Sequence, residues 1–496
     1  MLQTTWIALL LGFWSSLYLI DAFLKNYHLT SLHYFHLLEE TGISISIGQL
    51  RWYTTCFNRV FIRLGQFKPF FLHMWFSFGV AFGLISMVIS LFVLTLMVFN
   101  TLSQQPVDQQ VLTPVMPGVN LPTSQMSYYL LTLLICGILH EFGHALAAVR
   151  EQVHVNGFGF FILILYPGAF VEMSTEHLKV IAPIRQLRIY CAGVWHNFII
   201  VLAALLVLLL LPTCLLPFYT IGNSVVVSYV VQGSAVSGPR GLVVGDPITS
   251  ISGCRVTSID DWYTCIAVSI KEGNLGNCMA LNVIQDLDTS MAGAFMKKNM
   301  TKTSPLNQPK DCCNQTSNTH LCFMYHVKSL PKTKFACLPA RTTTDRPSCK
   351  FRSDCYTPKV ETTCVYPALD NKTRLLRIIH GHKPPLLFLG DPLDLHYSVA
   401  VSNYVPNNSF IPISLPYVIE TFCKYLISLS GALVIINVIP CYALDGQWIC
   451  RAFIEFCLRP IIPNVEVRNA IYSVILIYGT IILLANVFIA MWTLFS

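Results

Sequence analysis

Charged residues are scarce in this sequence. Asp, Glu, Lys and Arg make up only 11% of its 496 residues, and hydrophobic residues make up 54%, whereas about 25% charged residues are usual in soluble proteins. A soluble enzyme and a disordered chain are therefore excluded. About six apolar runs are each long enough to cross a hydrocarbon core of about 30 Å; they cover residues 2–24, 71–99, 126–149, 187–211, 418–439 and 470–495. The sequence predicts a polytopic, predominantly α-helical membrane protein embedded in a lipid bilayer.

The excess of positive charge does not indicate a nucleic-acid partner. The net charge is +7, and 19 of the 32 Lys and Arg lie in residues 212–417, scattered among Pro, Thr and Cys without a periodic basic face.

The first apolar run lacks a basic leader and a small-residue cleavage site, which indicates a retained anchor. We expect four regions: membrane anchors and loops (1–125), a membrane core (126–211), a polar insert (212–417) and a C-terminal membrane core (418–496).

The distribution of Lys, Arg and Cys predicts the orientation, because short basic loops face the cytosol whereas disulfides and N-glycans mark the lumen. Basic residues gather in 25–68, 150–188 and 451–468, which we expect to be cytosolic. Ten of the eighteen Cys lie between Cys254 and Cys364, and four N-x-S/T sequons lie in the same polar insert, so we expect it to be lumenal. The candidate glycosylation sites are Asn299, Asn314, Asn371 and Asn407. Parity puts the N-terminus in the lumen as well, but a re-entrant second segment would reverse this, and its side stays open.

The polar insert changes character along its length. Residues 241–253 alternate apolar residues around Gly turns, which is typical of short strands. Residues 297–367 are rich in Cys, Lys, Thr and Pro and have little hydrophobic periodicity, so we expect their order to come from disulfides. The absence of paired C-x2-C spacing favours disulfides over the alternative, a zinc ribbon, and the pairing of the ten cysteines stays open.

The third apolar run contains an H-E-x-x-H sequence at His140, Glu141 and His144. Residues four apart share one face of a helix, so the two imidazoles can bind one Zn²⁺ at about 2.0–2.1 Å. Zinc lowers the pKa of a water molecule, whose proton Glu141 can take and pass to a leaving amine. These polar groups are costly in an apolar segment unless they are paired or coordinated. The alternatives are a buried helix whose polar residues bond to neighbouring helices, and a proton relay in a transporter.

A catalytic zinc usually takes three protein ligands, so a further ligand is needed. Asp445 follows the fifth apolar run, between Pro440 and Gly446, which indicate a helix that breaks at membrane depth. Asp445 can therefore reach the metal; the alternative is a cytosolic Asp-Gly turn without a ligand role. With Asp445 as the third ligand the set is complete, and His196 is then interpreted as a packed polar residue.

An H-E-x-x-H in a membrane helix, followed about 300 residues later by a membrane-embedded L-D-G, resembles the site-2 protease family of intramembrane metalloproteases. The resemblance covers essentially the whole chain. It implies that His140, His144 and Asp445 bind one Zn²⁺ per chain and that Glu141 is the catalytic base.

The chain departs from two patterns that are common in this family. Where the family often has N-P-x-P-x-x-x-L-D-G, the second position here is Val438, and where it often has G-P-x-x-N, Val194 replaces the Pro. The departures leave the implied ligands intact and affect the local backbone around Asn197 and Asn437. We expect these two asparagines either to contact the substrate or the ligand side chains, or to form ordinary hydrogen bonds between helices.

The resemblance also implies a PDZ-like module in the insert, carried by residues 241–253, which would bind the trimmed lumenal end of a substrate. The alternative is a scaffold for the Cys-rich segment.

Residues 157–172 are rich in Gly, aromatic and β-branched residues, which favours an extended or re-entrant hairpin beside the site. Its edge could align an unwound substrate by strand addition; the alternative is a strand pair that seals the zinc from lipid.

By resemblance, the substrates are membrane-anchored transcription factors of the sterol-regulatory and ER-stress kinds, cut first in the lumen by another protease. Their cytosolic portions would be released at the Golgi or endoplasmic reticulum membrane, with the zinc site toward the cytosol. Two other function classes are a non-catalytic relative that binds and retains membrane clients, and a transporter. A transporter would normally show internal repeats with paired broken helices, and the sequence contains none.

Overall fold

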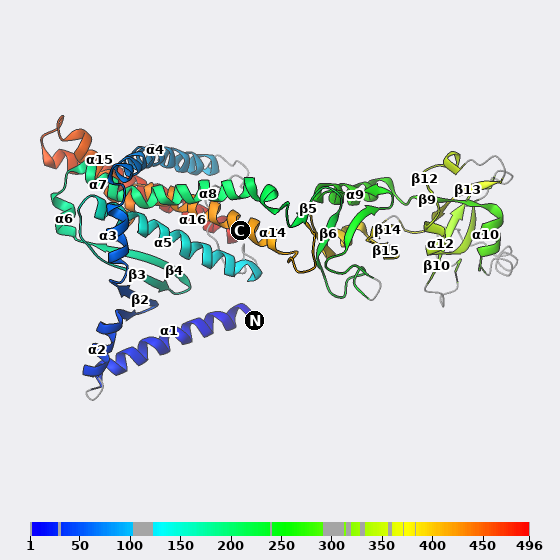
Figure 1. Ribbon diagram of the computed structural model, residues 1–496, viewed down its shortest axis with the longest axis horizontal. Coiled ribbons are helices and arrows are strands. Elements are labelled where there is room, and N and C mark those ends of the chain that lie inside the picture. Colours follow the sequence, from blue (N-terminus) through cyan, green and yellow to red (C-terminus); the bar gives the residue numbers. More distant parts are fainter. Residues whose placement is uncertain are drawn as a thin grey trace. The chain divides into compact units, whose positions relative to one another are not determined.

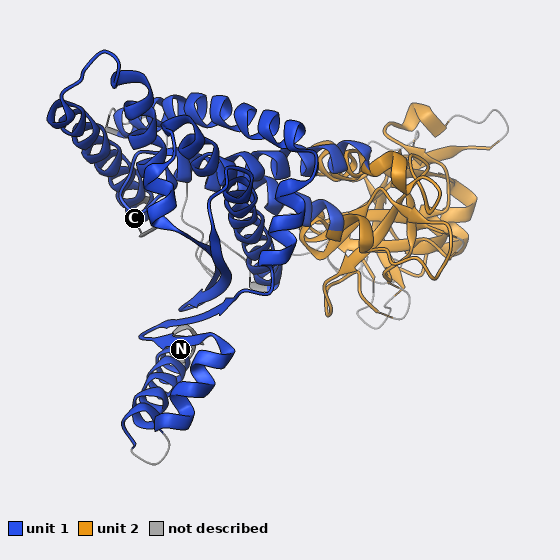
Figure 2. Cartoon of the chain, turned by 60° about the vertical axis from the view of Figure 1, so that its left-hand side comes forward, with its two compact units in different colours: residues 1–210, 419–496 blue, residues 211–418 orange. Residues whose placement is uncertain are grey.

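The computed structural model describes residues 2–27, 31–102, 123–238, 241–290, 312–313, 319–327, 333–355, 360–370, 372–381 and 383–495. The chain forms two compact units, which Figure 2 shows in different colours. Residues 1–210 and 419–496 form the first, here called the membrane unit, and residues 211–418 form the second, here called the insert unit. Three of the candidate glycosylation sites, Asn299, Asn314 and Asn371, lie outside the described residues.

Six helical spans of the described chain are long and apolar enough to cross a membrane, which confirms the six predicted runs. Ala8–Asn26 lies in α1 (Leu2–Asn26), Pro69–Thr101 in α4 (Pro69–Leu102), and Met126–Arg150 is α5. Pro183–Leu215 joins α7 (Pro183–Tyr190) and α8 (Ala192–Leu215), Leu415–Val438 is α14, and Val465–Trp492 lies in α16 (Val465–Phe495). Figure 1 shows α4, α5 and α8 running in roughly the same direction. Short helices α6 (Thr175–Val180) and α15 (Asp445–Leu458) complete this part of the chain.

The membrane unit also contains a four-stranded antiparallel sheet in the order β1-β2-β3-β4. Strands β3 (Val155–Leu163) and β4 (Tyr166–Met173) form the hairpin predicted at residues 157–172. Strands β1 (Ile43–Ser46) and β2 (Gln49–Thr54) come from residues 25–68, which the sequence predicted only as a cytosolic loop. That segment also contains α2 (Ser31–Thr41) and α3 (Asn58–Gln66). The prediction missed these elements because pairing with β3 satisfies backbone groups of both strands, and this gain depends on a segment about 100 residues away.

The insert unit contains a six-stranded antiparallel sheet in the order β15-β14-β7-β6-β16, with β8 paired to β7. Its strands are β6 (Val225–Val230), β7 (Pro247–Ile251), β8 (Cys254–Arg255), β14 (Arg374–His380), β15 (Leu386–Gly390) and β16 (Val399–Ser402). Helices α9 (Ile259–Glu272) and α13 (Pro392–Ser398) pack in the same part of the chain, and Trp262, Ile248 and Ile378 are fully buried in its core. A separate strand pair joins β5 (Tyr219–Thr220) to β17 (Val405–Pro406). The predicted PDZ-like module stays a prediction.

A second sheet of the insert unit is built from residues between α9 and β14, in the order β11-β10-β13-β9-β12. Its strands are β9 (Gly276–Ala280), β10 (His320–Tyr325), β11 (Lys334–Pro339), β12 (Ser348–Cys349) and β13 (Thr362–Pro367), accompanied by α10 (Leu281–Leu287) and α12 (Ala340–Thr344). Ten of the eleven cysteines of the insert unit are paired: Cys254–Cys265, Cys278–Cys355, Cys312–Cys322, Cys313–Cys337 and Cys349–Cys364, and Cys214 is free.

Disulfides are not the only source of order in this second sheet, contrary to the expectation from its composition. Phe323, Leu338 and Val365 are fully buried in an apolar cluster that also contains Met279 and Ile284. The apolar positions are spread over short strands separated by Cys, Thr and Pro, so that no single stretch of sequence shows their periodicity. The packed core and the five bridges therefore stabilise the sheet together.

Candidate metal centre

Two helices bring three potential metal ligands together in the membrane unit. His140 and His144 are buried on one face of α5, one turn apart. Asp445 is the first residue of α15, and its Oδ2 lies 2.8 Å from His140 Nε2 and 3.1 Å from His144 Nε2. The two Nε2 atoms are themselves 3.1 Å apart. The ligand atoms thus form a nearly equilateral triangle, although Asp445 is separated from the histidines by about 300 residues.

The dimensions and chemistry of this triangle fit a zinc ion. A tetrahedral Zn²⁺ with bonds of about 2.0–2.1 Å separates its ligand atoms by about 3.3 Å, and the three distances here are 2.8, 3.1 and 3.1 Å. Two imidazole nitrogens and one carboxylate oxygen are a donor set of catalytic zinc sites, which leave the fourth position open. His140, His144 and Asp445 form one of two groups in the described chain whose ligand atoms lie close enough together to hold a metal ion.

The far side of each imidazole is held by a neighbour. His144 Nδ1 donates to the backbone carbonyl oxygen of Ile189 at 2.8 Å, so its Nε2 is free to bind a metal. His140 Nδ1 lies 3.1 Å from the side-chain amide of the fully buried Asn197. Asn197 presents Nδ2 to the ring, and its Oδ1 has no hydrogen-bond partner among the described residues. Turning the amide by half a turn lets Oδ1 accept from His140 Nδ1–H, the tautomer that leaves Nε2 for a metal.

The backbone of β4 fixes the carboxylate of Glu141. Glu141 Oε2 accepts a hydrogen bond of 3.0 Å from the Val171 N–H. The predicted hairpin therefore lies directly against the H-E-x-x-H helix, and its last strand contacts the candidate catalytic base. This N–H points away from the sheet ladder, at an edge of the sheet that pairs with no further strand among the described residues.

A sharp turn delivers Asp445 to the histidines. Helix α14 ends at Val438, and the chain turns through residues 439–444 before α15 begins. Ala443 has a φ of +68°, a conformation that residues with a side chain rarely adopt. The predicted break therefore lies at Pro440, whereas Gly446 lies inside α15. A Cβ on Gly446 would be 2.0 Å from the carbonyl oxygen of Ile439. Gly446 is needed for this close approach of helix and turn, and not for the break itself.

Buried ion pairs hold α7, which supplies the Ile189 carbonyl. Glu151, just after α5, is only 5% exposed. Its carboxylate accepts from Arg185 Nε at 2.8 Å and from Arg188 Nη1 at 3.1 Å. The two arginines on α7 are thereby tied to the end of α5. The sequence contained no signal for the roles of Ile189 and Val171, because both act through backbone atoms that every residue type carries.

The remaining predicted residues lie in different settings. His196 Nδ1 donates to the carbonyl oxygen of Ala192 at 2.8 Å, and its ring packs against aromatic side chains of α4, so it lies outside the three-residue group. Asn437 is half-buried in the last turn of α14 and, in the described chain, makes no hydrogen bond to the three candidate ligands. Asn407 is exposed in the insert unit, where its Oδ1 accepts from Thr220 Oγ1 at 2.6 Å.

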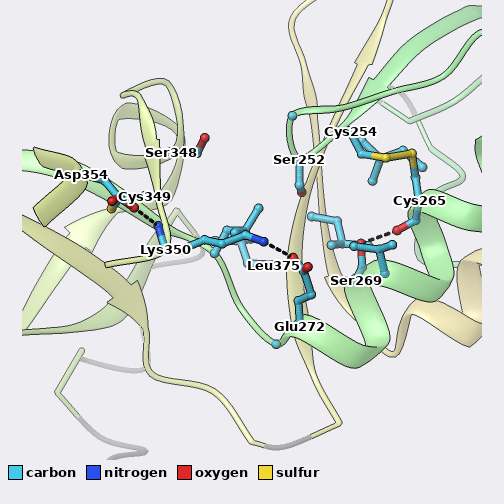
Figure 3. Close-up of a pocket in the computed structure, with 16 residues that line it drawn as sticks. Ser252, Cys254, Cys265, Ser269, Glu272, Ser348, Cys349, Lys350, Asp354 and Leu375 are labelled. Atoms are coloured by element: carbon cyan, nitrogen blue, oxygen red, sulfur yellow. Dashed lines mark hydrogen bonds and ion pairs between the residues drawn. A yellow bond between two sulfur atoms is a disulfide. The ribbon is translucent and has the colours of Figure 1, made fainter. Parts of the chain in front are cut away.

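The insert unit contains a pocket of about 340 Å³, shown in Figure 3. Its charged lining residues are paired with one another: Lys350 Nζ lies 2.7 Å from Glu272 Oε2, and the Lys350 N–H donates to Asp354 Oδ2. Cys349 also lines it and, with Cys278 and Cys355, forms the other group of close potential metal ligands in the described chain, but all three are in disulfides. These groups are already satisfied by one another, so the catalytic candidate is the centre in the membrane unit.

Comparison with known proteins agrees with this geometry. The model of peptidase family M50 matches residues 128–482, more than half of the chain, including both histidines and Asp445. A protein of Arabidopsis thaliana named membrane-bound transcription factor site-2 protease homolog is 26% identical over 441 residues, covering 80% of this chain and 84% of the relative. The chain therefore belongs to peptidase family M50, the site-2 protease family of membrane-bound metalloproteases.

Proposed function

We propose that this protein is a zinc-dependent intramembrane protease that hydrolyses a peptide bond within the transmembrane segment of a membrane-anchored protein. The observation that carries the proposal is the convergence of His140, His144 and Asp445 at distances of 2.8–3.1 Å, next to Glu141 on the same helix. Membership of a metallopeptidase family supports it.

His140, His144 and Asp445 would hold one Zn²⁺ per chain, which when bound would polarise the scissile carbonyl and acidify the attacking water. Glu141 takes a proton from that water and delivers it to the leaving nitrogen, as general base and then general acid. The Val171 N–H holds Glu141 Oε2, which leaves Oε1 for the water. Ile189 and Asn197 keep the two rings oriented.

Strand β4 is well placed to align a substrate. Alternate residues of a strand point the same way, so the edge groups of Ala169 and Met173 are expected to lie on the same side as the Val171 N–H that reaches Glu141. An unwound substrate that added to this edge would run past the catalytic base. Pro167, at the next such position, has no N–H and ends the ladder toward the hairpin tip. We expect Ala169→Pro to reduce cleavage, and unchanged cleavage would favour a sealing role for the hairpin.

We infer that the substrates are membrane-anchored transcription factors, of the sterol-regulatory and ER-stress kinds, after a first cut in the lumen. The name of the Arabidopsis thaliana relative, which contains "membrane-bound transcription factor", supports this substrate class. The insert unit would lie in the lumen of the Golgi or endoplasmic reticulum, because ten of its cysteines form five disulfides. The exposed Asn407 would be available there for glycosylation.

The decisive experiment compares the purified parent with Glu141→Gln, using Glu176→Gln on the exposed face of α6 as a matched control. Zinc per mole and cleavage of a helical membrane substrate without its lumenal domain are measured on each. We expect about one zinc in all three proteins, with cleavage by the parent and the control only. Zinc without cleavage by any of them would favour a non-catalytic protein that binds membrane clients. Absence of zinc from the parent would contradict the metal site.

A further inference from the structure

The start of α8 passes the two histidines at a residue without a side chain. A Cβ built on Gly193 would lie 2.4 Å from His144 Nε2 and 2.6 Å from His140 Nε2, whereas real Cβ atoms essentially never approach closer than 3.0 Å. Among the described glycines, Gly193 is the one whose added Cβ would touch the candidate ligand atoms. A methyl group at this position and a metal bound to both nitrogens would therefore compete for the same face of the histidine pair.

Neither ring can move aside without losing its orientation. His144 is held at Nδ1 by the carbonyl oxygen of Ile189, and His140 is held at Nδ1 by Asn197. A rotation that relieved the contact with a Cβ would break one of these hydrogen bonds and turn Nε2 away from Asp445. Ile189, Gly193 and Asn197 are spaced by four residues, and this part of the chain thus orients both rings from behind and leaves room in front of them.

We propose that Gly193 is a positioning residue that keeps open the space in which the metal and the two imidazoles meet. This inference rests on the proposed zinc-protease function and adds a requirement that the ligand set does not contain. The atoms that a Cβ would meet are the ends of two side chains, which can rotate, and not backbone. Gly193→Ala is therefore expected to keep the fold and to lose the metal.

Three variants separate this role from ordinary packing. Gly193→Ala tests the proposal, and Gly431→Ala on α14 is the neutral control, because no described atom outside its own helical turn lies within 4 Å of its added Cβ. Gly143→Ala is the packing control, because its Cβ would meet His196 Nδ1 at 2.6 Å and the Ala192 carbonyl oxygen at 2.8 Å. The three atoms nearest to this Cβ include none from the rings of His140 and His144.

The measurements are zinc affinity by chelator competition, the visible absorption bands of the Co²⁺-substituted protein, and the melting temperature of the metal-free protein. Gly193→Ala is expected to bind zinc about 100-fold more weakly than the parent, to lose the tetrahedral Co²⁺ bands and, because a displaced ring gives up one hydrogen bond, to lower the metal-free melting temperature only slightly. Gly143→Ala is expected to lower the metal-free melting temperature more than Gly193→Ala does, and to weaken zinc binding less. Zinc affinity and Co²⁺ bands like the parent's in Gly193→Ala would overturn the inference.

The outcomes distinguish this inference from the function on which it rests. A parent that binds zinc and cleaves, together with a Gly193→Ala variant that does the same, would contradict only the role of Gly193. A parent without zinc would contradict both. If Gly193→Ala does not fold, its combination with His140→Ala and His144→Ala removes both rings; recovery of the fold would support the steric conflict, and no recovery would overturn it.

Discussion

Replacing Gly446 by Ala should displace Asp445 and remove the metal. The added Cβ would lie 2.0 Å from the Ile439 carbonyl oxygen, 2.3 Å from the Ile439 carbonyl carbon and 2.6 Å from the Val438 carbonyl oxygen. These are backbone atoms of the turn before α15, so no side-chain rotation can relieve the contact. Because the shortest acceptable distance is 3.0 Å, helix and turn must separate by about 1 Å.

A shift of this size is large compared with the geometry of the site. Asp445 Oδ2 lies 2.8 and 3.1 Å from the two Nε2 atoms, and a misplacement of about 1 Å can cost about 100-fold in rate. Overpacking of this kind usually destabilises a protein by about 1–3 kcal/mol. Gly446→Ala should therefore lower both the melting temperature and the zinc affinity, whereas Gly193→Ala should lower mainly the zinc affinity.

The assay is the zinc content and the thermal melting of the full chain in detergent, with Gly431→Ala as the control that meets no atom within 4 Å. Gly479→Ala gives an independent test, because its Cβ would lie 2.2 Å from the Pro440 carbonyl oxygen in the same turn. Parent-like zinc content and melting temperature in Gly446→Ala would refute the reasoning, because the turn would then have to yield without moving Asp445.

Three further predictions concern the surroundings of the site and the insert unit. Asn197→Ala should weaken zinc about 10- to 100-fold by chelator competition, and Asn197→Asp should restore it, because a carboxylate also accepts from His140 Nδ1–H; equal affinity in both variants would contradict this role. Glu151→Ala leaves the largely buried Arg188 without its carboxylate partner and should reduce stability by about 3 kcal/mol in denaturant unfolding, whereas the exposed Glu176→Ala should change it little. The pKa of Asp261 lies below its usual value because Thr257 and Ser258 donate hydrogen bonds to its carboxylate at the start of α9. This contribution to stability is complete above about pH 4 and is lost as the pH falls through the lowered pKa, so the melting temperature of Asp261→Asn should approach that of the parent as the pH is lowered; a difference that does not depend on pH would contradict it.

Local sequence patterns were enough to predict the membrane spans and one half of the candidate site. A span needs only about 20 apolar residues in succession, and His140 and His144 share a helix face because of their spacing. The cysteine-rich composition likewise predicted disulfides in the insert. Each of these properties is set within a short stretch of chain, where helix geometry or composition decides the outcome.

Other features were decided only by tertiary packing. Residue spacing could not place Asp445 against the histidines, and the resemblance to a known family was needed to expect it there. Of the two candidate asparagines, Asn197 forms a hydrogen bond with His140, whereas in the described chain Asn437 forms none with the candidate ligands, a difference that depends on how α8 and α14 pack.

The sequence by itself determined that the protein is embedded in a membrane, where its six spans lie and which helix carries two histidines, because these follow from local hydrophobicity and periodicity. Only the tertiary structure decided what surrounds those histidines: the Ile189 carbonyl, the Val171 N–H and the open space at Gly193. The physical reason is that every residue type carries the same backbone groups, and that an empty space leaves no pattern of residues in the sequence. Their role arises only when elements distant along the chain come within contact distance.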